Sequence, residues 1–341
     1  MVNICRRECI GMKYNPVIMS LSGEDQSPET CVSKSCSMAE SPGTTANEIQ
    51  ETQPAGTIET QPLKPYPGFG QAVLLLLSFV FLQALASIPL AIAGLIGHPA
   101  AVAIPTLLAT AVVAYYGLQK TGISFGEVFP FGAVSISVFL SLLLTVGGSF
   151  VLLREVAGLV SSVIPPPKQF YRSVPYMLRT RPHLWETFLF AAIVAPLSEE
   201  ILFRGLILYG FLKRYGVRTA IIASALLFTL IHGNPWQFAT GAFFGTLLAW
   251  CFVRTRSLVP CIFAHMANNA LGCTMILIQM KFPAFRAVIA RGSAFQHLTL
   301  VAAGLVLAIS GIYLLRRAFN SSRSPVQAFL IGQSFAQSGK K

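Results

Sequence analysis

Hydrophobic residues are grouped into long runs along most of the chain between residues 70 and 318. The runs are separated by short segments that contain Pro, Gly, Lys and Arg. At about 1.5 Å per residue, most of these runs are long enough to cross much of a ~30 Å hydrocarbon core as helices. Lipid offers backbone amides no hydrogen-bonding partners, so each run is predicted to be helical. The eight runs cover residues 73–96, 100–116, 136–163, 188–212, 219–232, 238–252, 258–280 and 298–315.

The fifth run is short and has a distinct end. Residues 219–232 reach only about 21 Å as a helix, which is less than the bilayer core needs. The run ends at His232-Gly233-Asn234-Pro235, a sequence that stops a helix. We therefore expect this helix to end inside the membrane, beside a hydrated cavity, because broken backbone at that depth must be covered by protein or water.

Charged residues interrupt the third run and follow it. Arg154 and Glu155 lie inside residues 136–163, so we expect that span to end near Leu153. Three prolines, residues 165–167, come next. The segment after them mixes basic and aromatic side chains, which is typical of a helix at the membrane interface. These side chains are Lys168, Phe170, Arg172, Tyr171, Tyr176, Arg179, Arg181 and Trp185.

Composition agrees with a membrane environment. The chain is 54% hydrophobic and 11% charged, whereas soluble domains carry about 25% charged residues. The sequence thus predicts an all-α fold, a polytopic transmembrane bundle of about eight helices over residues 70–318. Lys and Arg cluster at the ends of the runs, which favours contact with anionic lipids over nucleic acid. We expect both termini in the cytoplasm at the plasma membrane. That orientation places Lys120, Lys213, Arg214, Arg218, Arg254, Arg256, Arg316 and Arg317 inside, and Lys168, Arg172, Arg179, Arg181, Lys281, Arg286 and Arg291 outside.

The two tails differ from this core. Residues 1–69 hold eight of the thirteen acidic residues, show no hydrophobic periodicity and are rich in Ser, Thr, Pro and Gln, which predicts disorder. Residues 319–341 form a basic C-terminal tail. The cysteines of the first tail have spacings that match no zinc pattern, and we assign them no role in the activity. They are Cys5, Cys9, Cys31 and Cys36.

Two adjacent carboxylates in the fourth run are the first candidates for chemistry. Ionisable groups at this depth cost about 2.5–3.5 kcal/mol each on insertion scales. On a helix, Arg204 lies about 40° from Glu200 but about 140° from Glu199, so we expect Arg204 to pair with Glu200. Glu199 is then left without a cation in an apolar site, which suits taking a proton from water. A purely structural ion cluster is the alternative interpretation.

Imidazole and carboxamide groups follow in neighbouring helices. His232 ends the fifth run four residues after Phe228, where a histidine is more often a capping residue. His265 and Asn269 are four residues apart, hence on one helix face, and together can polarise a carbonyl and stabilise an oxyanion. Asn268 is expected to face a neighbouring helix instead. Interhelical hydrogen bonding is the alternative role for this pair.

These residues form three short motifs in a fixed order within about 70 residues of apolar helices. Each motif is weak by itself, but the order and spacing of all three are specific. Ser198 carries no histidine spacing that marks an activated nucleophile. The motifs are Glu199-Glu200-x-x-x-Arg204, Phe228-x-x-x-His232 and His265-x-x-x-Asn269.

In these motifs the chain resembles the CPBP family, which includes CAAX prenyl proteases of the Ras-converting type and bacteriocin-processing or immunity proteins, also called Abi. The resemblance covers about residues 188–280. It implies an eight-helix intramembrane endopeptidase acting on a membrane-associated protein or peptide, prenylated proteins among them. By the same resemblance, Glu199 and His232 activate the attacking water, His265 and Asn269 form the oxyanion hole, and Glu200 and Arg204 support the site.

The resemblance leaves metal dependence open, because the family is described both as metal-dependent and as glutamate-dependent. Glu199, His232 and His265 could in principle ligate zinc. The chain lacks His-Glu-x-x-His, the compact arrangement that identifies many zinc peptidases, so we favour no cofactor. Two other functions remain as alternatives: a proton-coupled transporter, and a non-enzymatic immunity or scaffold protein of the same fold. Cys261, one helical turn from His265, serves as a control position.

Overall fold

A computed structural model describes residues 65–95, 98–167, 184–282, 284 and 294–321. Helices make up most of these residues, and they contain no β-strand, which confirms the all-α prediction. The disordered N-terminal tail, its four cysteines and most of the basic C-terminal tail fall outside the described residues. The same holds for most of the segment predicted to lie at the interface, although Trp185 is described and is exposed.

Each predicted run is helical over most of its length, and the fourth is divided into five consecutive helical segments. Six of the described helices are long and apolar enough to span a membrane: α1, α2, α4, α10, α11 and α13. The chain is therefore a multi-pass integral membrane protein. The elements are α1 (Phe69–Ile92), α2 (Ala100–Thr121), α3 (Phe125–Val128), α4 (Ile136–Val163), α6 (Leu184–Leu189), the π-helix η2 (Phe190–Val194), α7 (Ala195–Glu200), the π-helix η3 (Ile201–Ile207), α8 (Leu208–Arg214), α9 (Val217–Ile231), the 3₁₀ turn η4 (Pro235–Gln237), α10 (Phe238–Thr255), α11 (Val259–Lys281) and α13 (Ala294–Ser321).

The third span does not end near Leu153 as predicted. Helix α4 continues unbroken through Arg154 and Glu155 to Val163. Arg154 lines a cavity, and a charged side chain at such a place does not require the helix to end.

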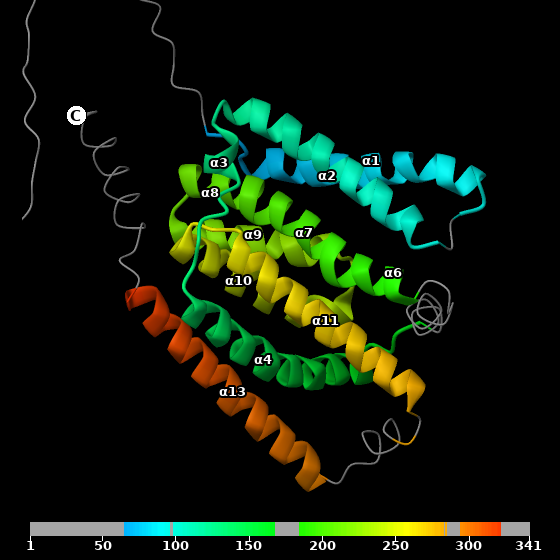
Figure 1. The fold of residues 1–341 in the computed structure, drawn as a ribbon, viewed down its shortest axis with the longest axis vertical. Helices are drawn as coiled ribbons and strands as arrows, with labels where there is room; N and C mark the ends of the chain where they lie inside the picture. Colours follow the sequence, from blue (N-terminus) through cyan, green and yellow to red (C-terminus); the bar gives the residue numbers. More distant parts are fainter. Residues whose placement is uncertain (1–64, 96–97, 168–183, 283, 285–293, 322–341) are drawn as a thin grey trace, which may run out of the picture. The chain divides into compact units, whose positions relative to one another are not determined.

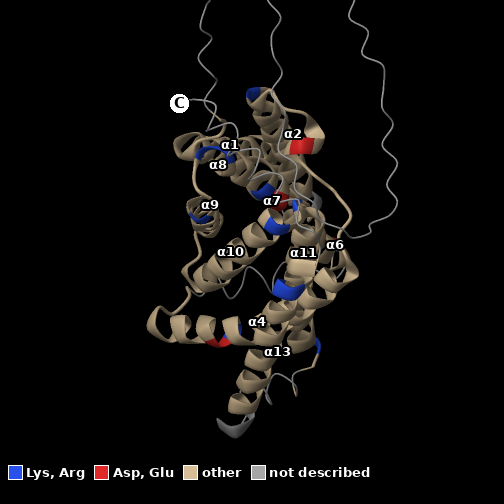
Figure 2. Ribbon diagram, turned by 90° about the vertical axis from the view of Figure 1, so that its left-hand side faces the viewer, with Lys and Arg blue, Asp and Glu red and all other residues tan. Residues whose placement is uncertain are grey.

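Successive long helices run in alternate directions (Figure 1). At one end of the bundle, the Arg254 guanidinium donates a hydrogen bond of 2.8 Å to the Asn320 side chain. At the other end, the Trp236 indole N–H donates to the Ile164 carbonyl at 2.6 Å. We call the first end the basic end, because the residues predicted to share one side of the membrane lie at or near the helix ends there; Figure 2 shows Lys and Arg in blue on the ribbon. They are Lys120, Lys213, Arg214, Arg218, Arg254, Arg256, Arg316 and Arg317.

Small residues bring the outer helix α13 against α4. A Cβ added to Gly148 of α4 would collide with the backbone of Gly304 and Ala308 in α13. A Cβ added to Gly311 of α13 would likewise meet the backbone of Thr145. Close backbone approach through small residues is typical of helix association in membranes, where packing rather than the hydrophobic effect holds helices together. This contact fixes α4, which forms one wall of the site described next.

Candidate active site

The candidate site is built around a helix whose regular hydrogen bonding is interrupted on both sides of α7. In η2, the Ala195 amide bonds to the Phe190 carbonyl, five residues earlier. After η3, the Leu208 amide bonds to the Phe203 carbonyl in the same way. Such π-type segments are rare and frequently mark functional sites. Glu199 and Glu200 are the last two residues of α7, between the two segments.

Glu200 is fully buried and is held by two donors. Its Oε1 accepts one hydrogen bond from Arg204 Nη1 at 2.8 Å and a second from His265 Nδ1 at 2.7 Å. The predicted pairing of Arg204 with Glu200 is thus confirmed. The two hydrogen bonds join the centre of the broken helix to α11, so Glu200 fixes the position of the His265 ring.

Arg204 is also fully buried, and its second amino group reaches α10. Arg204 Nη2 donates to the carbonyl oxygens of Phe244 at 3.4 Å and Gly245 at 3.3 Å. The guanidinium lies 4.6 Å from the centre of the Phe228 ring, a cation–π distance. A Cβ on Gly245 would come within 3.0 Å of Ala225 in α9, so the glycine allows α10 to approach closely. Arg204 therefore ties α9 and α10 to the broken helix.

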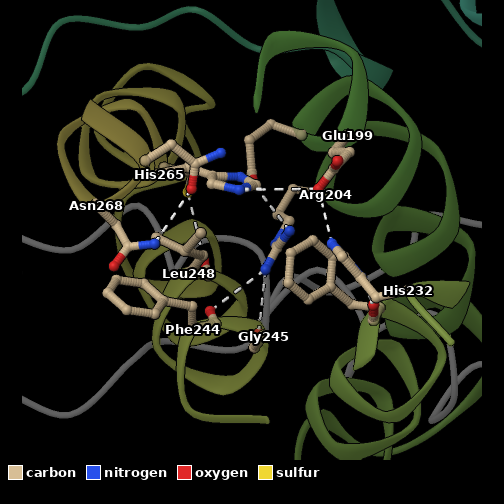
Figure 3. A network of polar contacts seen from close by, with 12 residues as sticks. Glu199, Arg204, His232, Phe244, Gly245, Leu248, His265 and Asn268 are labelled. Atoms are coloured by element: carbon tan, nitrogen blue, oxygen red, sulfur yellow. Dashed lines mark hydrogen bonds and ion pairs between the residues drawn. The ribbon is translucent and has the colours of Figure 1, made fainter. Parts of the chain in front are cut away.

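Glu199 points to the other side of the helix, toward two imidazoles (Figure 3). Its Oε2 lies 3.8 Å from His232 Nε2 and 3.8 Å from His265 Nε2. These separations are too long for direct hydrogen bonds, and Oε2 has no hydrogen-bond partner within the described part of the chain. The predicted division of the two glutamates, one paired with Arg204 and one not, is confirmed in this geometry.

The other ring nitrogen of each histidine is already engaged. His232 Nδ1 lies 2.7 Å from the Phe228 carbonyl oxygen, which only accepts, so Nδ1 carries the proton. His265 Nδ1 donates to the Glu200 carboxylate. In neutral rings both Nε2 atoms are then bare acceptors facing the Glu199 carboxylate. Glu199 Oε2 and the two Nε2 atoms are three acceptors that lie close together. A shared proton or a bridging water is needed between them to offset their mutual repulsion.

Asn269 joins the site from α11, one turn after His265. Its Nδ2 donates to the Ala191 carbonyl of η2 at 2.9 Å, and its Oδ1 accepts from Asn268 Nδ2 at 3.2 Å. The expectation that Asn268 faces only a neighbouring helix is wrong. Asn268 lines the same cavity as Asn269 and bonds to it, because the α11 surface toward the cavity is wider than a single row of residues.

A cavity of about 590 Å³ opens from this cluster. Its polar wall contains Glu199, His232, His265, Asn268 and Asn269, and the rest is mostly apolar. Its residues come from the second half of α4, the start of α10 and the middle of α11, among other segments. Residues that the sequence did not assign to the site also line it: Arg154, Trp236, Gln237, Thr240 and Cys273.

The two nucleophiles considered from the sequence, Cys261 and Ser198, face elsewhere. Cys261 is fully buried, and its thiol donates to the Leu248 carbonyl at 3.3 Å, away from the cavity wall. Ser198 is buried, and its side chain does not line the cavity. Within the described ranges, no three His, Cys, Asp or Glu side chains are arranged to hold a metal ion as they stand.

Residues 181–271, which contain all three motifs, match the family model described as Type II CAAX prenyl endopeptidase Rce1-like. CAAX prenyl protease 2 of Arabidopsis thaliana is 25% identical over 197 residues, 51% of this chain and 62% of that protein. CAAX prenyl protease 2 of Homo sapiens is 26% identical over 118 residues, 29% and 36% of the two chains. UPF0177 protein YxdF of Lactococcus lactis subsp. lactis (strain IL1403) is 27% identical over 91 residues, 26% and 50% of the two chains. The matches thus span less than two thirds of each relative, and no solved structure matches this chain.

Proposed function

Because its residues 181–271 place this chain in the CPBP family with an Rce1-like domain, we propose that it is an intramembrane endopeptidase of the CAAX prenyl protease type. Its substrate would be a membrane-associated protein, prenylated proteins among them. The observation that carries the proposal is the convergence of the Glu199 carboxylate with the Nε2 atoms of His232 and His265 at the wall of a cavity between apolar helices.

In this proposal, a water molecule is held between Glu199 Oε2 and His232 Nε2. The 3.8 Å gap between these atoms is too long for a direct bond, whereas a water can donate one hydrogen to each of them. Glu199 takes a proton as the water oxygen attacks the carbonyl carbon of the substrate. The same proton then passes to the leaving nitrogen as the C–N bond breaks. His232 accepts the second hydrogen of the water, which directs a lone pair of the water oxygen toward the carbonyl carbon.

The charges of the cluster assign a role to His265. Glu199 and Glu200 carry one negative charge each, and Arg204 carries one positive charge. One further proton makes the buried cluster neutral, which a low-dielectric site favours. When this further proton is on His265, His265 Nδ1 still donates to Glu200, and His265 Nε2 becomes a donor that can stabilise the oxyanion.

Asn269 would complete the oxyanion hole. One Nδ2 hydrogen is used by the Ala191 carbonyl, and the second is available to a substrate in the cavity. Glu200 and Arg204 support the reaction without touching substrate, since both are fully buried behind His265. This arrangement supports the division into four reacting and two supporting residues.

The proposed chemistry uses no metal. Glu199, His232 and His265 are the residues that a zinc-dependent mechanism would use, but their present separations do not form a ligand set, and no step is assigned to an ion. We expect full activity after treatment with a strong chelator and less than stoichiometric metal in the purified protein. Chelator-sensitive activity restored by Zn²⁺ would contradict this.

The central test is Glu199→Gln in the full chain, purified and returned to lipid vesicles. Cleavage of a prenylated peptide that ends in a CAAX sequence, followed by mass spectrometry, should fall by about 10²–10⁴-fold, the usual contribution of a general base. His232→Ala should also abolish hydrolysis. Both variants should unfold at nearly the wild-type temperature.

Glu186→Gln is the matched control. Glu186 lies on the same helical run and pairs with His98 at 3.4 Å, outside the cavity wall, so its loss should leave cleavage unchanged. Wild-type cleavage by folded Glu199→Gln protein would defeat the mechanism. Loss of pH-dependent uptake without any cleavage would indicate a transporter, and a phenotype that survives Glu199→Gln would indicate a scaffold.

A further inference from the structure

Arg154 is a cation in an unusual place. It lies within α4, nine residues before the helix ends at Val163, in a run whose one other charged residue is Glu155. A charged side chain facing lipid at such a position costs about 2.5–3.5 kcal/mol on insertion scales. The position therefore calls for a compensating environment.

The cavity provides that environment. Phe150, Leu153, Arg154 and Ala157 all line it, and their spacing of three, four and seven residues from Phe150 is that of a single helix face. Arg154 lines the cavity, and its side chain is exposed rather than packed in the interior. This face of α4 forms the wall of the same cavity that holds Glu199.

Nothing in the described part of the chain neutralises Arg154. It forms no hydrogen bond or ion pair there, and it is the sole Lys or Arg in the described cavity wall. Glu199 is the sole acidic residue in that wall, and its Oε2 is directed toward the two histidines. Five N–H donors are thus offered to whatever enters the cavity.

We propose that Arg154 binds the C-terminal carboxylate of the substrate, so that the enzyme recognises a free chain end beyond the cleaved bond. The inference rests on the proposed peptidase function and adds the residue that determines this specificity. A planar guanidinium matches a carboxylate through two parallel hydrogen bonds, which makes Arg the residue best suited to such a group.

The size of the cavity agrees with this occupant. A short C-terminal segment of three extended residues spans about 10 Å. A volume of about 590 Å³ lies within the range of roughly 300–1,000 Å³ usual for pockets that enclose small ligands. With the scissile carbonyl at Glu199, the released segment would lie between the α11 wall and α4. Gln237 and Thr240 offer neutral hydrogen-bonding groups along the cavity wall.

Two peptides that differ only at the C-terminus test the inference. One ends in a carboxylate and the other in a carboxamide, and both carry the same prenylated sequence. Wild-type protein in neutral-lipid vesicles should prefer the acid by about 10–100-fold in kcat/KM, expressed mainly in KM, as expected for a charge-assisted hydrogen bond. Arg154→Gln should cleave both peptides equally, and Arg154→Lys should keep part of the preference.

Glu155→Gln is the matched control, because it changes a charge at the adjacent α4 position without altering a cavity residue. It should keep the full preference for the acid. Equal cleavage of both peptides by the wild type, or an undiminished preference in Arg154→Gln, would overturn the inference. An Arg154→Gln defect that appears only with anionic vesicles, and equally for both peptides, would assign Arg154 to lipid phosphate and also overturn it.

A binding measurement separates this inference from the proposed reaction. Fluorescence anisotropy of the two labelled peptides with Glu199→Gln protein reports recognition without hydrolysis. The acid should bind more tightly than the amide, and Arg154→Gln in this background should remove the difference. A carboxylate preference in binding without any cleavage by the wild type would refute the peptidase and leave the role of Arg154 intact. Equal binding of the two peptides alongside normal wild-type cleavage would refute the role of Arg154 and leave the proposed peptidase function intact.

Discussion

Two neighbouring regions of this molecule share one turn of helix and differ in whether their carboxylate is held by direct hydrogen bonds. On one side, Glu200 and Arg204 are fully buried, oppositely charged and bonded to three further groups. On the other side, Glu199 is partly exposed and stands 3.8 Å from two imidazoles, beyond hydrogen-bond reach. The first region has the properties of a framework. In the second, the carboxylate faces a cavity without a direct hydrogen bond to its Oε2 in the described residues, and in the proposed function it activates water.

The comparison shows why adjacent and identical side chains take different roles. A buried carboxylate that accepts hydrogen bonds from strong donors is held in one position. A carboxylate that lacks donors can exchange a proton with whatever fills the gap. The positions of their partners decide the outcome, since Arg204 follows Glu200 by four residues and Glu199 by five.

The largest effect on stability should come from breaking the framework region. Arg204→Leu leaves Glu200 as a buried charge without its cation, so we expect the free energy of unfolding to fall by about 3–5 kcal/mol. Thermal unfolding in detergent micelles measures this as a lower midpoint. Glu199→Gln, which removes a charge facing a cavity, should change the midpoint little.

A double variant sharpens the same point. Glu200→Gln combined with Arg204→Leu removes both charges, so its loss of stability should be smaller than the sum of the two single losses. Additive losses would mean that the pair does not act as a unit and that the two regions are less distinct than their contacts indicate.

An intermediate effect should appear at the boundary between the regions. Asn269→Ala removes one of the proposed oxyanion donors and should lower kcat by about 10²–10³-fold with KM nearly constant. Asn268→Ala should cost less, because Asn268 only bonds to Asn269 Oδ1 at 3.2 Å. Steady-state kinetics of both variants provide the check, and a larger loss for Asn268→Ala would reverse the assigned roles.

The smallest effect should come from Cys261, which belongs to neither region although it lies one turn from His265. Its thiol donates to the Leu248 carbonyl within the core, and a serine hydroxyl at the same place can donate as well. Cys261→Ser should therefore leave both cleavage and the unfolding midpoint unchanged. A marked loss of cleavage would reopen the case for a thiol nucleophile.

Much of this arrangement could be predicted from local sequence, and the reasons are physical. Apolar runs predict helices because lipid permits little else, and four-residue spacing correctly paired Arg204 with Glu200. The end of the fifth run at His232 was predicted from the residues that follow it. These features depend only on residues close together in the chain.

Other features depend on helices that are distant in sequence. Nothing in residues 190–207 predicts two π-type segments, because their backbone dihedral angles are close to those of an ordinary helix. Arg154 was taken as the end of a span, since its sequence cannot reveal a cavity built by α10 and α11. The direction of Asn268 was missed for the same reason.

The buried apolar side chains between the cavity and the basic end bear on how well the membrane remains closed to ions. The proposed hydrolysis needs water inside the bilayer, yet a continuous aqueous path would also let protons and ions leak across. Between the cavity and the basic end lies a layer of fully or almost fully buried apolar side chains from η3, α8 and α10. Under the proposed function, this layer lets water enter from one leaflet while the other stays sealed, so the reaction need not dissipate ion gradients across the membrane. The sealing side chains are Phe203, Leu206, Phe211, Leu248 and Phe252.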